Sequence, residues 1–405
     1  MSLDKNRHWA ENHRHSKKAP NDGVGKGKKM PTTMISADDH IDLGYLPRDL
    51  WTARLPQSLR ERAPHVEDRG EKGEYWVCDG ESWAEYRGER WFAKANRTRL
   101  ALDRGGVGEA HRPTTPEKRL IDMDRDGVEA SLMFPPIIAM QVGEPELRNA
   151  CVQAYNDWAL EFGKSAPKRF FPVAMLSSVD AEAARDEVIR VAKLGFREAN
   201  FLVNDVTLQM NLKPWDIFWD AAEEAGIVVS YHVGGSTQSG TVRATIDGMK
   251  PGERQGVFDM GLSNGATSFF NPFVNMFNFG TLERHPKLKF CLAESALGWI
   301  PFVVQEMDYR YKRQFERRKA AEIPLKSMPS EIFKRQVWAT FQTDLVGLHL
   351  TQFFGAGHIM WGSDYPHPDS TWPFSQEIVA KDSAHLPEEV KRKVYRDNAK
   401  ALYGL

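Results

Sequence analysis

The sequence has few cysteines, and this scarcity excludes several classes of protein. Its three cysteines are Cys78, Cys151 and Cys291, and no two of them have Cys-x-x-Cys spacing. Neither a disulfide framework nor a thiolate zinc site is therefore indicated, and we expect a reducing compartment. The residues after Met1 also lack the apolar core of a secretory signal, so we expect a cytoplasmic protein.

An excess of charge of one sign and a long apolar run are also missing. The 54 basic and 55 acidic residues give a formal net charge of -1, which provides no field favouring nucleic acid or an acidic membrane surface. No segment approaches the ~18 consecutive apolar residues of a membrane span. Because 41% of the residues are hydrophobic, the chain has enough material for a folded core. We therefore expect a globular protein whose partner is a small molecule.

Residues 1–33 have no hydrophobic period and are rich in lysine, arginine and glycine. Three histidines lie here, at positions 8, 13 and 15, but a flexible segment must be ordered before its imidazoles can chelate a metal ion. The composition predicts a flexible basic N-terminal arm, followed by one domain over residues 34–405.

Within that domain, short apolar runs alternate with amphipathic segments. Eight runs have the character of buried parallel strands, at about 34–41, 128–134, 170–175, 196–202, 227–232, 288–293, 337–343 and 358–363. Segments such as 181–193 and 215–225 have helical periodicity and are followed by Gly195 and Gly226. This alternation predicts an α/β fold. Because no strand is followed by a nucleotide-binding glycine motif, we favour a distorted (β/α)8 TIM barrel over a doubly wound sheet.

Two insertions, at about 50–113 and 236–262, interrupt the alternation. The first contains the pattern of a β-hairpin that turns at Asp79-Gly80. Both insertions follow the carboxyl end of a strand, so we expect both on the catalytic face, the first as a lid after strand 1. The alternative for the hairpin is a surface decoration or a contact between subunits.

Metal-binding side chains end three of the predicted strands. Asp38 and His40 end the first strand, His232 ends the fifth and Asp364 follows the eighth. Residues i and i+2 of a strand face the same side, so Asp38 and His40 should both point into the barrel mouth while Asp39 points away. The carboxyl ends of barrel strands meet at one rim. The sequence therefore predicts one divalent metal ion bound by these four side chains.

Four motifs occur in an order typical of one enzyme family. They are Ile35-Ser36-Ala37-Asp38-Asp39-His40, Tyr231-His232-Val233-Gly234, Trp361-Gly362-Ser363-Asp364-Tyr365-Pro366-His367 and Asn398-Ala399-Lys400-Ala401-Leu402-Tyr403-Gly404. From about residue 34 onward the chain resembles the amidohydrolase-2 branch of the amidohydrolase superfamily, the branch of aminocarboxymuconate semialdehyde decarboxylase. The resemblance implies a distorted (β/α)8 barrel, one divalent ion that is often zinc or manganese, and usually a homodimer.

Two positions depart from the family pattern. Many members have His-x-His where this chain has Asp38 and His40; a carboxylate also occurs there in the family's decarboxylases, and this harder ligand favours manganese over zinc. The family's decarboxylases usually carry a proton-handling histidine after the sixth strand, where this chain has Glu294. Three roles stay open for Glu294: a proton carrier with a raised pKa, a further metal ligand, or a structural residue that pairs with an arginine or holds the loop of Trp299.

The candidate catalytic residues are Asp364, Glu294 and His367. We expect Asp364 to accept a proton beside the metal ion, or else only to cap the turn that follows it. His367 either orients a substrate carboxylate or phenol, or is an ordinary loop histidine. The missing histidine favours a mononuclear metal-dependent hydrolase, acting through an activated water on a small aromatic or carboxylate-bearing molecule. The alternatives are a non-oxidative metal-dependent decarboxylase, a related hydratase, and a metal-stabilised scaffold without activity.

Overall fold

The computed structural model describes residues 33–41, 46–86, 115–136, 142–234, 249–250, 253, 265–320, 326–367 and 369–405. The chain divides into two compact units, Met1–Pro31 and Thr32–Leu405, and all described residues belong to the second. The predicted N-terminal arm lies outside the described residues except for Thr33. Residues 87–113 of the first insertion and nearly all of the second insertion also lie outside them.

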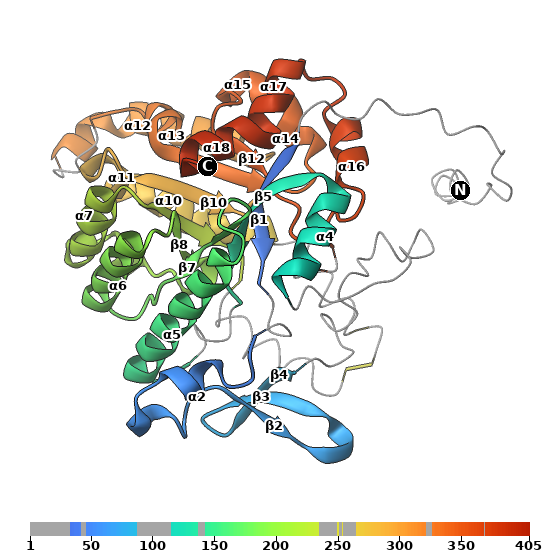
Figure 1. The fold of residues 1–405 in the computed structure, drawn as a ribbon. Helices are drawn as coiled ribbons and strands as arrows, with labels where there is room; N and C mark the ends of the chain where they lie inside the picture. The colour runs from blue at the N-terminus through green and yellow to red at the C-terminus, as the bar shows by residue number, and fades with distance from the viewer. Residues whose placement is uncertain are drawn as a thin grey trace, which may run out of the picture. The chain divides into compact units, whose positions relative to one another are not determined.

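Each of the eight predicted apolar runs forms β structure. The strands are β1 (Met34–His40), β5 (Val128–Phe134), β6 (Phe170–Pro172), β7 (Ala174–Met175), β8 (Glu198–Leu202), β9 (Val228–His232), β10 (Lys289–Ala293), β11 (Val337–Phe341) and β12 (Ile359–Trp361) (Figure 1). The third run divides at Val173, because β6 pairs with β5 whereas β7 pairs with β8. The predicted strands are thus confirmed, with one change of partner inside a run.

The strands pair in parallel and in chain order. One sheet has the order β1-β5-β6 and the other β12-β11-β10-β9-β8-β7. Leu202, His232 and Ala293 stand opposite one another in register, so the carboxyl ends of β8, β9 and β10 lie level. The segment after β12 bonds to β1, with Asp364 N donating to Asp38 O at 2.7 Å and His40 N donating to the carbonyl of residue 365 at 2.7 Å. Side chains at these strand ends therefore lie close together.

Helices connect the strands, as the alternating sequence predicts. Those of eight or more residues are α4 (Pro116–Asp126), α5 (Pro145–Lys164), α6 (Ala181–Leu194), α7 (Asp216–Ala225), α10 (Phe270–Asn278), α12 (Ile300–Ala320), α13 (Pro329–Gln336) and α16 (Ser375–Asp382); the shorter ones are α2 (Leu50–Arg54), α11 (Thr281–Arg284), α14 (Leu345–His349), α15 (Thr351–Phe354), α17 (Glu388–Arg392) and α18 (Asn398–Tyr403). Gly195 and Gly226 end α6 and α7 at φ 99° and 66°, a left-handed conformation that glycine adopts without a Cβ penalty. The helix ends predicted there are confirmed.

The first insertion contains the predicted hairpin. β3 (Glu74–Cys78) and β4 (Glu81–Glu85) are antiparallel, and the turn residues Asp79 and Gly80 have φ of 51° and 80°, as a tight two-residue turn requires. A third strand, β2 (His65–Asp68), pairs with β3 and was not predicted. Trp76 of β3 contacts Trp51 edge to face, and the Trp51 indole donates to Cys151 O of α5 at 3.0 Å. The small sheet is thereby attached to the helical layer.

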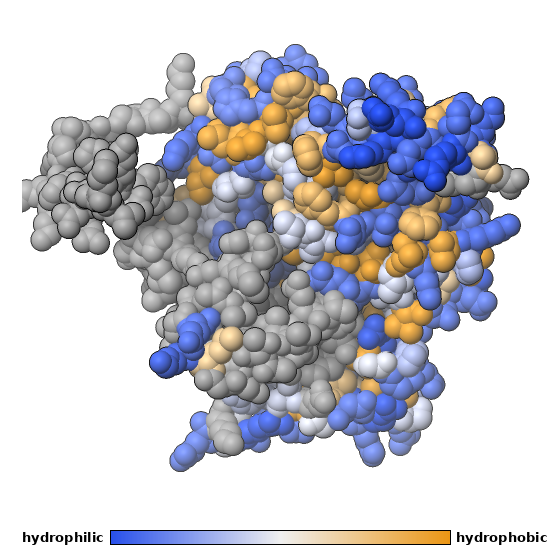
Figure 2. Space-filling model, turned by 180° about the vertical axis from the view of Figure 1, so that it is seen from behind, coloured by the Kyte–Doolittle hydropathy of each residue, from blue (hydrophilic) through white to orange (hydrophobic). Residues whose placement is uncertain are grey.

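The centre of the parallel sheets is apolar and includes the end of the chain. Its buried members are Ile35, Ala37, Ala130, Leu132, Phe134, Val173, Val228, Cys291, Ala293, Met360, Ala399, Leu402 and Tyr403. Each fully buried aliphatic or aromatic side chain stabilises the fold by about 1.5–3 kcal/mol. On the face seen in Figure 2, hydrophobic residues form small groups among hydrophilic ones. Among the described helices, none has the length and apolar character needed to cross a membrane.

Candidate metal centre

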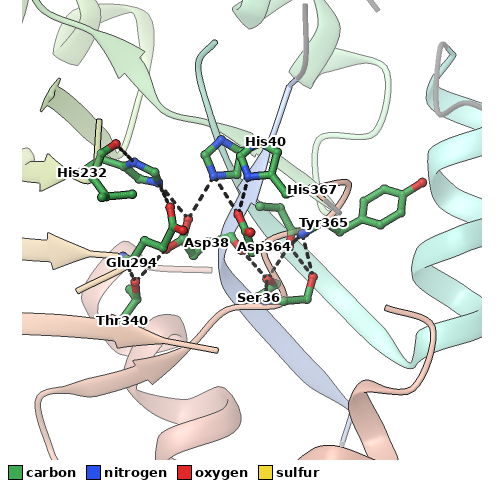
Figure 3. A network of polar contacts seen from close by, with 12 residues as sticks. Ser36, Asp38, His40, His232, Glu294, Thr340, Asp364, Tyr365 and His367 are labelled. Atoms are coloured by element: carbon green, nitrogen blue, oxygen red, sulfur yellow. Dashed lines mark hydrogen bonds and ion pairs between the residues drawn. The ribbon is translucent and has the colours of Figure 1, made fainter. Parts of the chain in front are cut away.

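The structure brings the four predicted metal ligands together at the carboxyl ends of β1, β9 and β12. His40 Nε2 lies 3.0 Å from Asp364 Oδ1 and 3.7 Å from Asp38 Oδ1. His232 Nε2 lies 3.4 Å from Asp38 Oδ1. Figure 3 shows the carboxylates of Asp38 and Asp364 facing these imidazoles. All four residues are at most 5% exposed, so the cluster is shielded from water.

The donor atoms of this cluster fit a divalent ion. Asp38, His40 and His232 form one group of ligand atoms within 4.8 Å of one another, and His40, Asp364 and His367 form a second that shares His40. Within the described part of the chain, His40 Nε2 and both Asp364 oxygens are buried without a well-formed hydrogen bond. Buried polar atoms of folded proteins nearly always have a partner. Imidazole nitrogens and carboxylate oxygens are the ligands that zinc and manganese accept.

The two buried histidines, His40 and His232, differ in their pKa values because their hydrogen bonds and neighbouring charges differ. His232 Nδ1 lies 2.8 Å from Val233 O, so Nδ1 carries a proton and Nε2 faces the carboxylates. Burial alone would lower the pKa of His232, but Asp38 and Glu294 raise it to about 9. Burial and the neighbouring His367 lower the pKa of His40 to about 4. His40 is therefore neutral at pH 7, whereas His232 must release a proton to bind a metal ion.

Glu294 lies at the same site, directly after β10. Its Oε2 is 3.5 Å from His232 Nε2, and its side chain is 22% exposed. Burial and the charge of Asp364 raise the pKa of Glu294 well above its ordinary value, although His232 opposes the shift. Among the described residues its ion-pair partner is His232, so the structural role of pairing with an arginine is not supported there.

The backbone at Glu294 and Asp364 is unusual. Both residues adopt positive φ, 56° and 61°, in a region that costs a non-glycine residue about 1–3 kcal/mol. Such conformations persist only where the surroundings enforce them, and they are common at functional sites. His367 N donates to the backbone carbonyl of Asp364 at 2.9 Å, and both Asp364 carboxylate oxygens lack a well-formed hydrogen bond, so the carboxylate does not cap this turn.

His367 lies at the outer side of the cluster. Its Nδ1 is 2.9 Å from Asp364 Oδ1, and its ring stacks on that of His40 with centroids 3.9 Å apart. The side chain is 25% exposed, more than any of the four predicted ligands. Burial would raise the pKa of Asp364, but the His367 and His40 imidazoles hold it below its ordinary value. Asp364 is therefore ionised at neutral pH, and His367 is the most exposed imidazole of the cluster.

Thr340 of β11 belongs to the site and was not predicted. Its hydroxyl donates to Asp38 Oδ2 at 2.8 Å and accepts a hydrogen bond from Glu294 N at 2.7 Å. Thr340 thus orients a predicted ligand and the backbone of a predicted catalytic residue together. A lone threonine near the end of an apolar strand has no distinctive sequence signal.

Comparison with known proteins identifies the family of this chain. The amidohydrolase family matches residues 79–405, so the chain belongs to that family, as the sequence motifs predict. It is an enzyme of the amidohydrolase superfamily. No curated protein matches the sequence.

Solved structures with the same fold have low sequence identity to this chain. An amidohydrolase from Mycobacterium avium subsp. paratuberculosis has a TM-score of 0.71 at 21% identity, over 93% of this chain and 98% of the other. A 5-carboxyvanillate decarboxylase from Novosphingobium aromaticivorans has a TM-score of 0.61 at 17% identity, over 94% and 99%. A 2,6-dihydroxybenzoate decarboxylase from Rhizobium has a TM-score of 0.55 at 19% identity, over 71% and 88%.

Proposed function

We propose that this enzyme is a metal-dependent carboxy-lyase that removes carbon dioxide from a small aromatic acid without a redox cofactor. The observation that carries the proposal is the buried cluster of Asp38, His40, His232 and Asp364, in which His40 Nε2 and both Asp364 oxygens lack a well-formed hydrogen bond. These residues would hold one manganese or zinc ion. Support for the reaction comes from neighbours that decarboxylate 5-carboxyvanillate and dihydroxybenzoates, two of which contain manganese.

The cluster residues and His367 would bind and orient the substrate. When bound, the divalent ion would act as a Lewis acid that stabilises negative charge on a substrate oxygen. His367, the most exposed imidazole of the cluster, would donate a hydrogen bond to the substrate carboxylate or a neighbouring phenol oxygen. Asp364 would hold the His367 ring through Nδ1 and stay ionised throughout.

Glu294 would supply the proton that decarboxylation requires. Because burial and Asp364 raise its pKa, Glu294 would hold a proton more readily than an ordinary carboxyl group does. As carbon dioxide leaves, the electron pair of the broken carbon–carbon bond stays on the ring carbon, and Glu294 would transfer its proton to that carbon. Its partial exposure allows reprotonation from solvent.

Hydrolysis, the function preferred from the sequence, is the second candidate. It is favoured by Glu294, a carboxyl group at the position where the family's decarboxylases usually have a histidine. In this reaction Asp364 would remove a proton from water and Glu294 would protonate the leaving group. The similar structures favour decarboxylation, but they do not contradict hydrolysis. Hydration of an alkene would use the same residues.

We further infer that the two parallel sheets close into one distorted barrel. Two observations support closure: β6 and β7 are separated only by Val173, and the segment after β12 bonds to β1. The lid role of the first insertion, a homodimer, the flexible arm and a cytoplasmic location stay predictions from the sequence.

A substrate panel tests the reaction. Manganese-loaded enzyme would be incubated with hydroxybenzoates and methoxyhydroxybenzoates, and separately with phenyl esters, anilides and lactones. We expect carbon dioxide and the matching phenol in equal amounts from the first set. Glu294→Gln should lower kcat by about 10²–10⁴-fold while metal content is unchanged, because it removes a general acid. Acid release from the second set, with no carbon dioxide from the first, would instead identify a hydrolase.

A further inference from the structure

Asp39 lies between two predicted metal ligands on β1 and, as predicted, does not belong to their cluster. It is 1% exposed, and its carboxylate is surrounded by hydrogen-bond donors. Ser36 Oγ donates to Oδ1 at 2.7 Å, Ser363 Oγ donates to Oδ1 at 2.5 Å, and Ser131 Oγ donates to Oδ2. A buried carboxylate with this many donors is held in one orientation.

The donors to Asp39 include the residues on both sides of Asp364. Ser363 donates through its hydroxyl, and Tyr365 donates through its backbone N–H at 3.2 Å. Ser363 N also donates to Ser36 Oγ at 2.9 Å, close to the same carboxylate. The residues on both sides of Asp364, which has a φ of 61°, are therefore held by hydrogen bonds to β1. Figure 3 shows Ser36 and Tyr365 within this network.

Arg119 of α4 supplies the opposite charge. It is 1% exposed, and its Nη2 lies 3.5 Å from Asp39 Oδ2. Its Nη1 donates to the backbone carbonyl of His40 at 2.8 Å, and its Cζ lies 5.2 Å from the centre of the Tyr365 ring. The same guanidinium thus contacts the strand that carries two ligands and the turn that carries a third.

We propose that Asp39 is a positioning residue for the metal centre: it joins β1 to the Ser363–Tyr365 turn and thereby sets Asp364 against His40. This inference rests on the proposed function only in taking Asp364 as a metal ligand. A partner that orients a metal ligand typically contributes 10–100-fold to metal affinity. In Asp39→Asn, an amide N–H₂ group would face donors that now meet a carboxylate oxygen, so the turn would shift.

The test is manganese affinity by calorimetry on the full chain, with no substrate present. We expect Asp39→Asn to raise the manganese dissociation constant at least tenfold. The matched control is Asp126→Asn, because Asp126 is also 1% exposed and accepts from a buried serine, Ser375, but does not contact the 363–365 turn. Asp126→Asn should leave the dissociation constant within about twofold of wild type.

If Asp39→Asn does not fold, two milder serine variants test the same positioning role. Ser363→Ala removes one donor to Asp39 at the turn, and Ser375→Ala removes the equivalent donor to Asp126. Ser363→Ala should weaken manganese binding at unchanged circular dichroism, whereas Ser375→Ala should not. Equal affinity in Ser363→Ala and wild type, or equal losses in both serine variants, would overturn the positioning role and leave the proposed function intact. A wild-type enzyme that binds no divalent ion would overturn both.

Discussion

Gly362 lets the segment after β12 approach β1, so that the candidate metal ligands of both come together. A Cβ atom added there would lie 2.3 Å from Asp38 Cβ and 2.9 Å from the Asp38 backbone N and O. Real Cβ atoms do not come this close to other heavy atoms, and the Asp38 backbone is fixed by its place in β1. The glycine is therefore needed for Asp364 to reach His40.

Gly362→Ala should accordingly disturb the metal centre and the fold together. We expect a loss of about 1–3 kcal/mol in the free energy of unfolding, as for other overpacked sites, and weaker metal binding. Urea unfolding and a manganese titration measure the two effects. Gly357→Ala is the control, since no heavy atom lies within 4 Å of its added Cβ. Equal stability and affinity of the two variants would contradict this account of Gly362.

Single residues were predictable where the local sequence carries the information. Asp38, His40 and His232 each lie at the end of an apolar run. Because side chains alternate between the two faces of a strand, Asp38 and His40 point to the same side. Thr340 and the partners of Asp39 were not predictable. Thr340 and Asp38 are 302 positions apart in the chain, and nothing local to a threonine in a strand indicates such a neighbour.

At the scale of elements, the sequence predicted the parallel strands well because they are buried on both faces and read as continuous apolar runs. It did not predict the division of the third run at Val173, since a change of pairing partner leaves no mark on composition. The strand β2 was also missed, because His65–Asp68 is polar and pairs only along one edge. The Asp79-Gly80 turn was predicted because its two positive φ angles require residues of this kind.

The sheet β2-β3-β4 should depend on Trp76. This side chain is fully buried and contacts the Trp51 and Tyr86 rings, with centroids 5.2 and 5.5 Å away. Trp76→Ala would leave a cavity and should cost about 3–5 kcal/mol. Hydrogen exchange should show faster exchange over residues 65–85 and unchanged protection in β9 and β10.

Phe302→Ala is the control for this prediction, because Phe302 is 64% exposed and its removal should change stability by no more than about 0.5 kcal/mol. If exchange over residues 65–85 were the same in Trp76→Ala and wild type, the aromatic contacts would not be what holds this sheet.

For the whole molecule, Glu198 should make stability depend on pH. Glu198 is fully buried at the start of β8, and burial raises its pKa from 4.5 to about 7, although Ser230 and Tyr403 oppose the shift. The folded protein therefore binds this proton more tightly than the unfolded chain does. The stability that the proton contributes is complete below pH 4.5 and is lost as the pH rises to about 7.

Glu198→Gln removes this titration. The difference in unfolding free energy, variant minus wild type, should rise by roughly 3 kcal/mol between pH 4.5 and 7 and stay level above pH 7. Urea unfolding at several pH values measures it. Glu129→Gln should show the opposite slope, at and below about pH 4.5, because Arg396 lowers the pKa of Glu129 from its ordinary value. A flat difference curve for Glu198→Gln would mean that folding does not raise the pKa of Glu198.

The central claim is that side chains from β1, β9 and the turn after β12 bind one divalent ion. Anomalous diffraction at the manganese absorption edge, from crystals grown with manganese, tests it most directly. We predict one strong peak within bonding distance of Asp38, His40, His232 and Asp364. No peak there, or a peak bound by other residues, would contradict the account.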